Sequence, residues 1–245
     1  KKELADLEER TAKAQANNEK IKEKNEARTR LVKEGSDAFN QGNFDLAIAK
    51  FEEGYQLDPE FIGSAPSFLN NKAQALKQRA VNKYNEAAKS KDAGRIRQEK
   101  ESLVKDFTEA LDSVTKAYSL VKNSEKSGGG NATTNKEVLK FSESIVRDAL
   151  KVLSQLNLNL ASNTEEETTK GVKISKDLLV MLPKDPDVLA ILGLSLFASG
   201  EMQESLNYFA YYMEVAPKEH NRREAVGELV TYLTTDEKLK PQKIN

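Results

Sequence analysis

His220 is the only histidine among the 245 residues, and the chain contains no cysteine. A histidine acts as a general base when a carboxylate orients it and a nucleophile or a water lies within its reach. Glu219 is adjacent in sequence, but two neighbours on one loop do not form such a triad. We therefore expect His220 to lie at the surface or to pack within a loop, and we predict no catalytic residue.

The acidic residues have structural explanations too. Residues 165–167 are three glutamates that follow the helix-capping types Ser162, Asn163 and Thr164. Carboxylates are favoured in the first turn of a helix because they face the positive end of its dipole. No metal-loop spacing surrounds them. The sequence thus predicts no metal and no other cofactor, and a hydrolase site embedded in the fold is kept only as the rival enzymatic interpretation.

The overall charge gives no reason to expect a nucleic-acid partner. The formal net charge is -1 and the isoelectric point is about 6.1, with lysine and arginine interleaved among acids. Charged residues make up 31% of the chain and aromatic residues 7%, which suits helices stacked in thin layers. No apolar run is long enough to cross a bilayer, so no membrane span is expected in this segment.

Residues 31–59, LVKEGSDAFNQGNFDLAIAKFEEGYQLDP, have the pattern of a complete helix–turn–helix unit. Apolar and small residues recur at helical spacing on both sides of a turn at residues 40–43. Gly35 allows two antiparallel helices to approach closely, and Phe51 fills the seam between them. Pro59 ends the unit because it cannot continue a helix.

The same landmarks return in residues 186–217, PDVLAILGLSLFASGEMQESLNYFAYYMEVAP, at the same mutual spacing. Gly193, Gly200, Phe209 and Pro217 stand where the first unit has glycine, glycine, phenylalanine and proline. Both segments resemble the tetratricopeptide repeat (TPR). The resemblance is fair over residues 69–120 and weak over 145–183.

The resemblance implies an all-α fold, a TPR-like right-handed helical solenoid of about four helix pairs. The predicted organisation is a lead-in helix with weak coiled-coil character (1–33), two TPR-like repeats (31–123), a glycine-rich loop (124–134), two further repeats (135–217), and a capping helix with a loose polar tail (218–245). The second repeat is interrupted by an insertion, so we expect an elongated hairpin that turns near residues 91–94. The sequon at Asn131 lies in the predicted loop.

The resemblance also implies a non-enzymatic scaffold for protein–protein interaction, because first helices of TPR pairs line a concave groove. Side-chain amides suit such a groove, since they pair with both the N–H and the C=O of an extended backbone. The residues at groove-facing positions are Lys33, Ser36, Phe39, Asn40, Asn70, Asn71, Gln74, Lys77 and Gln78. The helix over residues 188–198 is apolar on all sides, so we expect it to be buried and the open groove to lie near residues 33–78.

Two alternatives remain at the level of sequence. Residues 1–33 are interpreted as a solvated helix, and the rival is an oligomerisation module in which this helix pairs two copies as a homodimer. Residues 61–80 and the lead-in helix resemble bacterial extracytoplasmic TPR-containing proteins with further domains upstream. That resemblance favours a periplasmic or extracellular location over a cytoplasmic one, and the amino-terminal Lys1 suggests a processed or excised chain.

Overall fold

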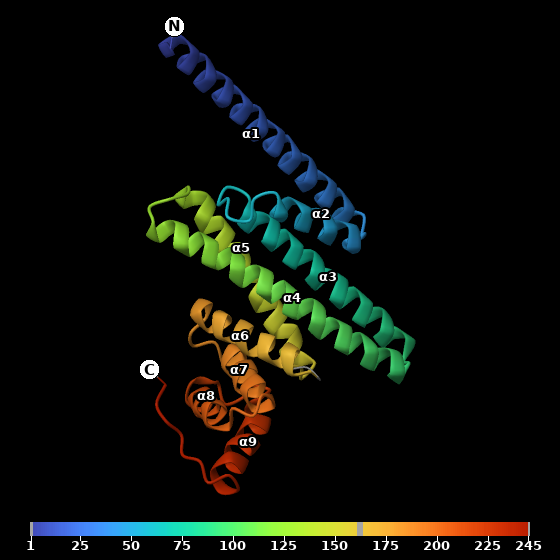
Figure 1. Cartoon of the computed structure of the whole chain (residues 1–245). Helices are drawn as coiled ribbons and strands as arrows, with labels where there is room; N and C mark the ends of the chain where they lie inside the picture. Colours follow the sequence, from blue (N-terminus) through green and yellow to red (C-terminus); the bar gives the residue numbers. More distant parts are fainter. Residues whose placement is uncertain (1, 161–163, 245) are drawn as a thin grey trace.

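The computed structural model describes residues 2–160 and 164–244, with side chains described from residue 9 onward. Every regular element in these ranges is an α-helix, so the predicted all-α class is confirmed for the described chain (Figure 1). No helix in these ranges is both long and apolar enough to cross a membrane. The helices are α1 Lys2–Asn40, α2 Phe44–Gln56, α3 Ala65–Ser90, α4 Ala93–Lys126, α5 Ala132–Gln155, α6 Glu165–Met181, α7 Pro186–Ala198, α8 Met202–Val215 and α9 Arg223–Thr235.

Figure 1 shows the helices stacked from α1 at one end to α9 at the other, with α5 beside α3 and α4. Each helix packs against the next one, except that α5 and α6 are held mainly by their other neighbours. Helix α5 packs on α3 and α4, and α6 packs on α4 and α7. Because α5 packs on α3, polar side chains on that side of α3 are buried between the two helices.

The two best-matched repeats pack in the same way. A Cβ atom added at Gly35 would lie 2.5 Å from the ring of Phe51, and one added at Gly193 would overlap the ring of Phe209. The turn glycines of both units, Gly42 and Gly200, adopt φ values of 76° and 85°, which residues with a side chain rarely occupy. The correspondence predicted between residues 31–59 and 186–217 therefore extends to the contacts.

Helix α1 is continuous across the predicted boundary between the lead-in and the first repeat. All side chains from residue 9 to residue 26 are exposed, and burial begins only near Leu31. The helix ends at the predicted turn, where Asn43 caps α2 by accepting a hydrogen bond from the backbone N–H of Leu46. The part of α1 before residue 24 thus extends beyond the stack (Figure 1), and the first contacts with the stack that the structure shows are those of Lys24 and Arg28 with Asp58.

The elongated hairpin consists of α3 and α4, which contain 26 and 34 residues. Helix α3 stops at Lys91, which adopts a left-handed conformation with φ of 57°, and Asp92 then caps α4 by accepting hydrogen bonds from the backbone N–H groups of Gly94 and Arg95. The turn therefore falls within the predicted interval. The hairpin is long enough to overhang the helices that follow it (Figure 1).

Helix α5 begins at Ala132, three residues before the predicted start near Asn135. The correction has a local cause, because the side chain of Asn131 accepts hydrogen bonds from the backbone N–H groups of Thr133 and Thr134 and so caps the helix. The glycine-rich connection is correspondingly short. Thr164 caps α6 as predicted, while Ser162 and Asn163 lie outside the described residues.

The carboxy-terminal core is built around α7. Residues 188–193 of this helix are all buried, which confirms the expectation from its apolar sequence. Helices α8 and α9 cover it, with Phe209 and Tyr212 fully buried beneath them. The segment after α9 differs from the expectation of a loose tail: residues 236–244 turn back over α8 and form hydrogen bonds with it.

Candidate functional site

His220 lies in a closed cluster between α8 and α9. Its Nδ1 atom is 2.7 Å from the hydroxyl oxygen of Tyr212, and its Nε2 atom is 3.4 Å from Oδ1 of Asp187. The Tyr212 side chain is fully buried, and this burial raises its pKa to about 12. A hydroxyl enclosed in this way is not accessible to a substrate, so the cluster holds the α8–α9 loop against α7. This placement agrees with the predicted loop-packing role of His220.

The described residues contain no group of three or more histidine, cysteine, aspartate or glutamate side chains arranged to hold a metal ion. The three glutamates at 165–167 instead occupy the first turn of α6, where the capping argument placed them. Glu167 takes part in an ion pair with Lys105 of α4, with 3.7 Å between Oε1 and Nζ.

Two of the predicted groove residues point into the molecule, which corrects their assignment. Asn70 is buried, donates a hydrogen bond to the backbone carbonyl of Val138 and accepts one from the hydroxyl of Ser142. Lys77 binds Asp148 at 2.5 Å. All three partners belong to α5, which packs across this face of α3. Asn70 and Lys77 therefore join two helices and are not available to a ligand.

The other predicted groove residues keep at least partial exposure. Lys33 and Asn40 are exposed, and the half-buried members are Ser36, Phe39, Asn71, Gln74 and Gln78. The ring of Phe39 packs edge-on against Phe44, with 5.5 Å between the ring centroids. Gln78 donates a hydrogen bond to the Asn82 side chain. What remains of the predicted groove is two sets of residues, one on α1 and one on α3, and α2 packs against both helices.

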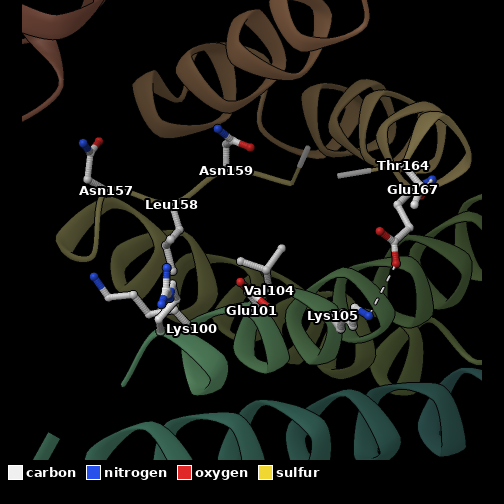
Figure 2. A pocket seen from close by; sticks show the side chains of 10 residues that line it. Lys100, Glu101, Val104, Lys105, Asn157, Leu158, Asn159, Thr164 and Glu167 are labelled. Atoms are coloured by element: carbon white, nitrogen blue, oxygen red, sulfur yellow. Dashed lines mark hydrogen bonds and ion pairs between the residues drawn. The ribbon is translucent and has the colours of Figure 1, made fainter. Parts of the chain in front are cut away.

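A crevice that sequence reasoning did not identify lies where the hairpin overhangs the carboxy-terminal half (Figure 2). It has a volume of ≈ 520 Å³. One wall is the first half of α4, and the other is formed by residues 157–159 and the start of α6. Its lining residues are Arg97, Lys100, Glu101, Val104, Lys105, Asn157, Leu158, Asn159, Thr164 and Glu167.

The crevice combines an apolar interior with a charged rim. Val104 and Leu158 are half-buried and supply its aliphatic surface. Figure 2 shows the ion pair of Lys105 with Glu167 spanning the two walls at one end. Beyond this pair a second hollow of ≈ 250 Å³ continues between α4 and α6 and shares Val104, Lys105 and Glu167 with the first. Together the two hollows form an elongated depression along α4.

The signal for this crevice was present only in part. Val104 and Phe107 recur at helical spacing in the sequence of α4, which indicates an apolar stripe. The position of α6 opposite α4 is a tertiary contact between segments about sixty residues apart, and helical periodicity does not specify which faces meet.

Comparisons with known proteins do not assign the chain to a family. No family model matches the sequence, and no curated protein matches it. Among solved structures, a crystal structure of MamA protein is similar, with 15% identity over 82% of this chain and 96% of that chain, at a TM-score of 0.23. A similarity at this level carries no argument about fold or function, which rest here on the helices and contacts described above.

Proposed function

We propose that the chain is a non-enzymatic TPR-like scaffold that binds an extended segment of another protein in the crevice between α4 and α6. The proposal rests on one observation, namely that the elongated hairpin supplies one wall of the crevice. Its α4 wall belongs to the elongated part of the hairpin, which overhangs the stack. A helix pair of ordinary length would leave this wall, and therefore the depression, absent.

The surface chemistry of the crevice favours a peptide. A protein interface typically has an apolar centre and a polar rim, which matches the arrangement of Val104 and Leu158 within a border of charged residues. Arg97 and Lys100 carry the opposite charge to Glu101 on the same wall. A ligand with side chains of both signs complements this border better than a single small anion would. The elongated shape suits several consecutive residues of a chain.

The test is selection from a displayed peptide library on the intact chain, followed by fluorescence anisotropy with the selected peptides. The double variant Arg97→Glu/Lys100→Glu should weaken binding about tenfold, since two lost rim contacts together contribute on the order of 1.4 kcal/mol. Lys89→Glu/Arg95→Glu is the matched control, because these residues are exposed near the hairpin turn and do not line the crevice.

Equal binding by the charge-reversed chain and the wild-type chain would overturn the proposal. Binding that is lost only with Asn71→Ala/Gln74→Ala would instead assign the function to the half-buried amides of α3. Asn70 and Lys77 are unsuitable for this purpose, because their substitution would also disturb the contact of α3 with α5.

The exposure of α1 supports a second candidate function, an oligomerisation module. Side chains from residue 9 to residue 26 make no contact that buries them in the described chain, and Ile21 is 50% exposed. Sedimentation velocity over a range of concentrations tests it. A dimer that dissociates on Ile21→Glu substitution would support pairing through α1, and a concentration-independent monomer would remove this candidate.

A further inference from the structure

The segment after α9 is held in an extended form across α8 (Figure 1). Its path is fixed first by the backbone N–H of Leu239, which donates to the carbonyl of Leu233 at 3.0 Å. The side-chain amide of Gln203 then donates to the carbonyl of Lys240 at 2.9 Å, and the backbone N–H of Gln242 donates to the side-chain oxygen of Asn207 at 2.8 Å. No helix or turn forms between residues 239 and 244.

The side-chain amides of Gln203 and Asn207 form a binding site for an extended backbone. Gln203 and Asn207 lie one helical turn apart on α8, and the Gln203 amide also donates to the Asn207 oxygen at 3.0 Å. Together they satisfy one C=O and one N–H that are two residues apart on the bound segment. Main-chain hydrogen bonds of this kind give affinity for an extended chain independent of its side chains, while adjacent pockets select the side chains.

An adjacent pocket is present and is incompletely filled. A hollow of ≈ 640 Å³ lies between the segment and helices α6, α7 and α8. The protein wall is mostly apolar, and its aliphatic and aromatic members are Leu179, Pro183, Leu189, Tyr208, Ala210 and Tyr211. Pro241 and Ile244 of the segment line the same hollow, and Glu214 stands at its edge together with Lys243.

The chain's own segment is held by few contacts. Residues 240–243 are exposed although they lie on α8, and only Leu239 and Ile244 are half-buried. A single hydrogen bond contributes little net stability in water, so the position of the segment depends largely on the high effective concentration that its covalent attachment provides. A segment from another protein with bulkier apolar side chains at these places would bury more of the hollow.

We infer that this strip of α8 is a second peptide-binding surface, occupied in the structure by residues 239–244 acting as an internal ligand. The partner is an extended segment of another protein. Its sequence has an apolar residue at position 1, a proline at position 3 and an apolar residue at position 6, which is the spacing of Leu239, Pro241 and Ile244. A lysine before the last apolar residue complements Glu214. This surface is separate from the crevice of α4 and α6.

The test uses the full chain and a fluorescent peptide with the sequence of residues 236–244, DEKLKPQKI. The variant Leu239→Asp/Ile244→Asp removes the two apolar anchors and should release the internal segment. This released chain is expected to bind the peptide at least about tenfold more tightly than the wild-type chain, in which the site is occupied. Adding Gln203→Ala/Asn207→Ala should abolish that gain.

Controls separate binding from altered folding. A peptide with aspartate in place of both leucine and isoleucine should not bind, and circular dichroism should show unchanged helix content in every variant. In the wild-type chain, saturating peptide should accelerate hydrogen exchange at the Gln242 amide, which the Asn207 oxygen otherwise protects. This second measurement does not depend on the released variant.

Peptide binding that is equal in the wild-type and released chains, with no change in exchange at Gln242, would overturn the inference. A concentration-dependent dimer that dissociates on release of the segment would also overturn it, because the occupant would then be a second copy of this chain. Neither result would bear on the crevice, whose variants lie on α4.

Discussion

Basic side chains link helices in both halves of the stack, but they bind different partners in each. In the amino-terminal half, Lys72 of α3 binds Glu52 of α2 and Glu109 of α4, each at 2.7 Å. In the carboxy-terminal half, the buried Arg222 donates to the backbone carbonyls of Leu153 and Leu158.

A second pair of residues repeats the contrast. Arg79 of α3 binds Asp45 of α2 and Asp106 of α4, each at 2.5 Å for its closest atoms. Arg223 instead donates to the carbonyls of Ala216 and Met213, at 2.7 and 2.9 Å. Lys72 and Arg79 thus bind carboxylates, which can be protonated, whereas Arg222 and Arg223 bind carbonyls, which cannot be.

The difference follows from what each sequence offers. The helices of the first half carry charged residues beside their apolar stripes. Because α3 lies between α2 and α4, its cations reach carboxylates of both helices. The second half is organised around α7, which has no charged residue after Asp187. Arg222 and Arg223 therefore bind carbonyls at helix ends and in a loop, while the more exposed Lys176 of α6 pairs with Glu204 of α8. We expect the first half to respond to acid and salt, and the second to respond to changes of packing and to alkali.

The largest expected effect comes from removing a cation of the first half. Arg79→Met leaves the Asp106 carboxylate, whose side chain is 10% exposed, without its partner, and should lower the free energy of unfolding by about 3 kcal/mol at pH 7. Arg222→Met should cost about 2 kcal/mol, since it removes hydrogen bonds to carbonyls only. Urea denaturation followed by circular dichroism measures both values.

The two variants should differ in how their loss of stability depends on pH. The cost of Arg79→Met should shrink on acidification, whereas that of Arg222→Met should stay the same between pH 7 and pH 4. Arg95→Met is the matched surface control and should change stability by less than about 0.5 kcal/mol. An equal response of both buried variants to acid would refute the distinction between the halves.

Alkali should loosen the second half. Burial raises the pKa of Tyr212 to about 12, above its ordinary value of about 10, so the folded state holds this proton more tightly than the unfolded state does. The resulting stability is complete below pH 10 and is lost as the pH rises toward 12, by about 2 to 3 kcal/mol. Hydrogen exchange should increase first in α7–α9. Tyr212→Phe should remove this part of the alkaline loss, and a loss of the same size in that variant would assign it to other groups.

Close packing at glycine should also distinguish helices within the second half. Gly193→Ala places a methyl group against the buried ring of Phe209 and should destabilise the protein by about 1 to 2 kcal/mol. Gly227→Ala in α9 meets only Met213, at 3.7 Å, and should be neutral or stabilising by up to about 1 kcal/mol, because alanine favours a helix. Similar midpoints of thermal unfolding for the two variants would show that α7 is packed less tightly than described.

The smallest expected effect concerns Asp45. The hydrogen bond from Arg79 holds the pKa of this carboxyl below its ordinary value, so its contribution is present above about pH 4 and is lost as the pH falls through the lowered pKa. Asp45 is largely exposed, and solvent screening limits the contribution to less than about 1 kcal/mol. Asp45→Asn should differ from the wild type at pH 6 and match it near pH 2. A difference that persists in acid would exclude the ion pair as its cause.

The elements of the fold were predictable because local signals agree with one another. The turn at residues 40–43, the capping of α6 by Thr164 and the burial of α7 each follow from residue types within one or two helical turns. Glycine and phenylalanine at matching places in the two clear repeats even indicated which side chains would meet. The division into domains and the handedness of the stack remain predictions.

The site was less predictable because it depends on which faces meet. Asn70 and Lys77 bind side chains and a carbonyl of α5 and are buried, whereas Asn71 and Gln74 of the same helix are half-buried, and the sequence of α3 does not show where α5 lies. The crevice on α4 and the strip on α8 both arise between segments far apart in sequence. For the final segment, a polar composition suggested disorder, whereas two amides on α8 supply the backbone hydrogen bonds that hold it in place.

The arrangement around α7 has a consequence for synthesis on the ribosome. One side of its apolar surface is covered by α8 and α9, and the same cluster includes Leu239. The amino-terminal hairpins can collapse while translation continues, but this hydrophobic cluster cannot close until Leu239 has emerged. During that interval the side of α7 that faces α8 and α9 is an uncovered apolar surface, which makes the nascent chain prone to aggregation.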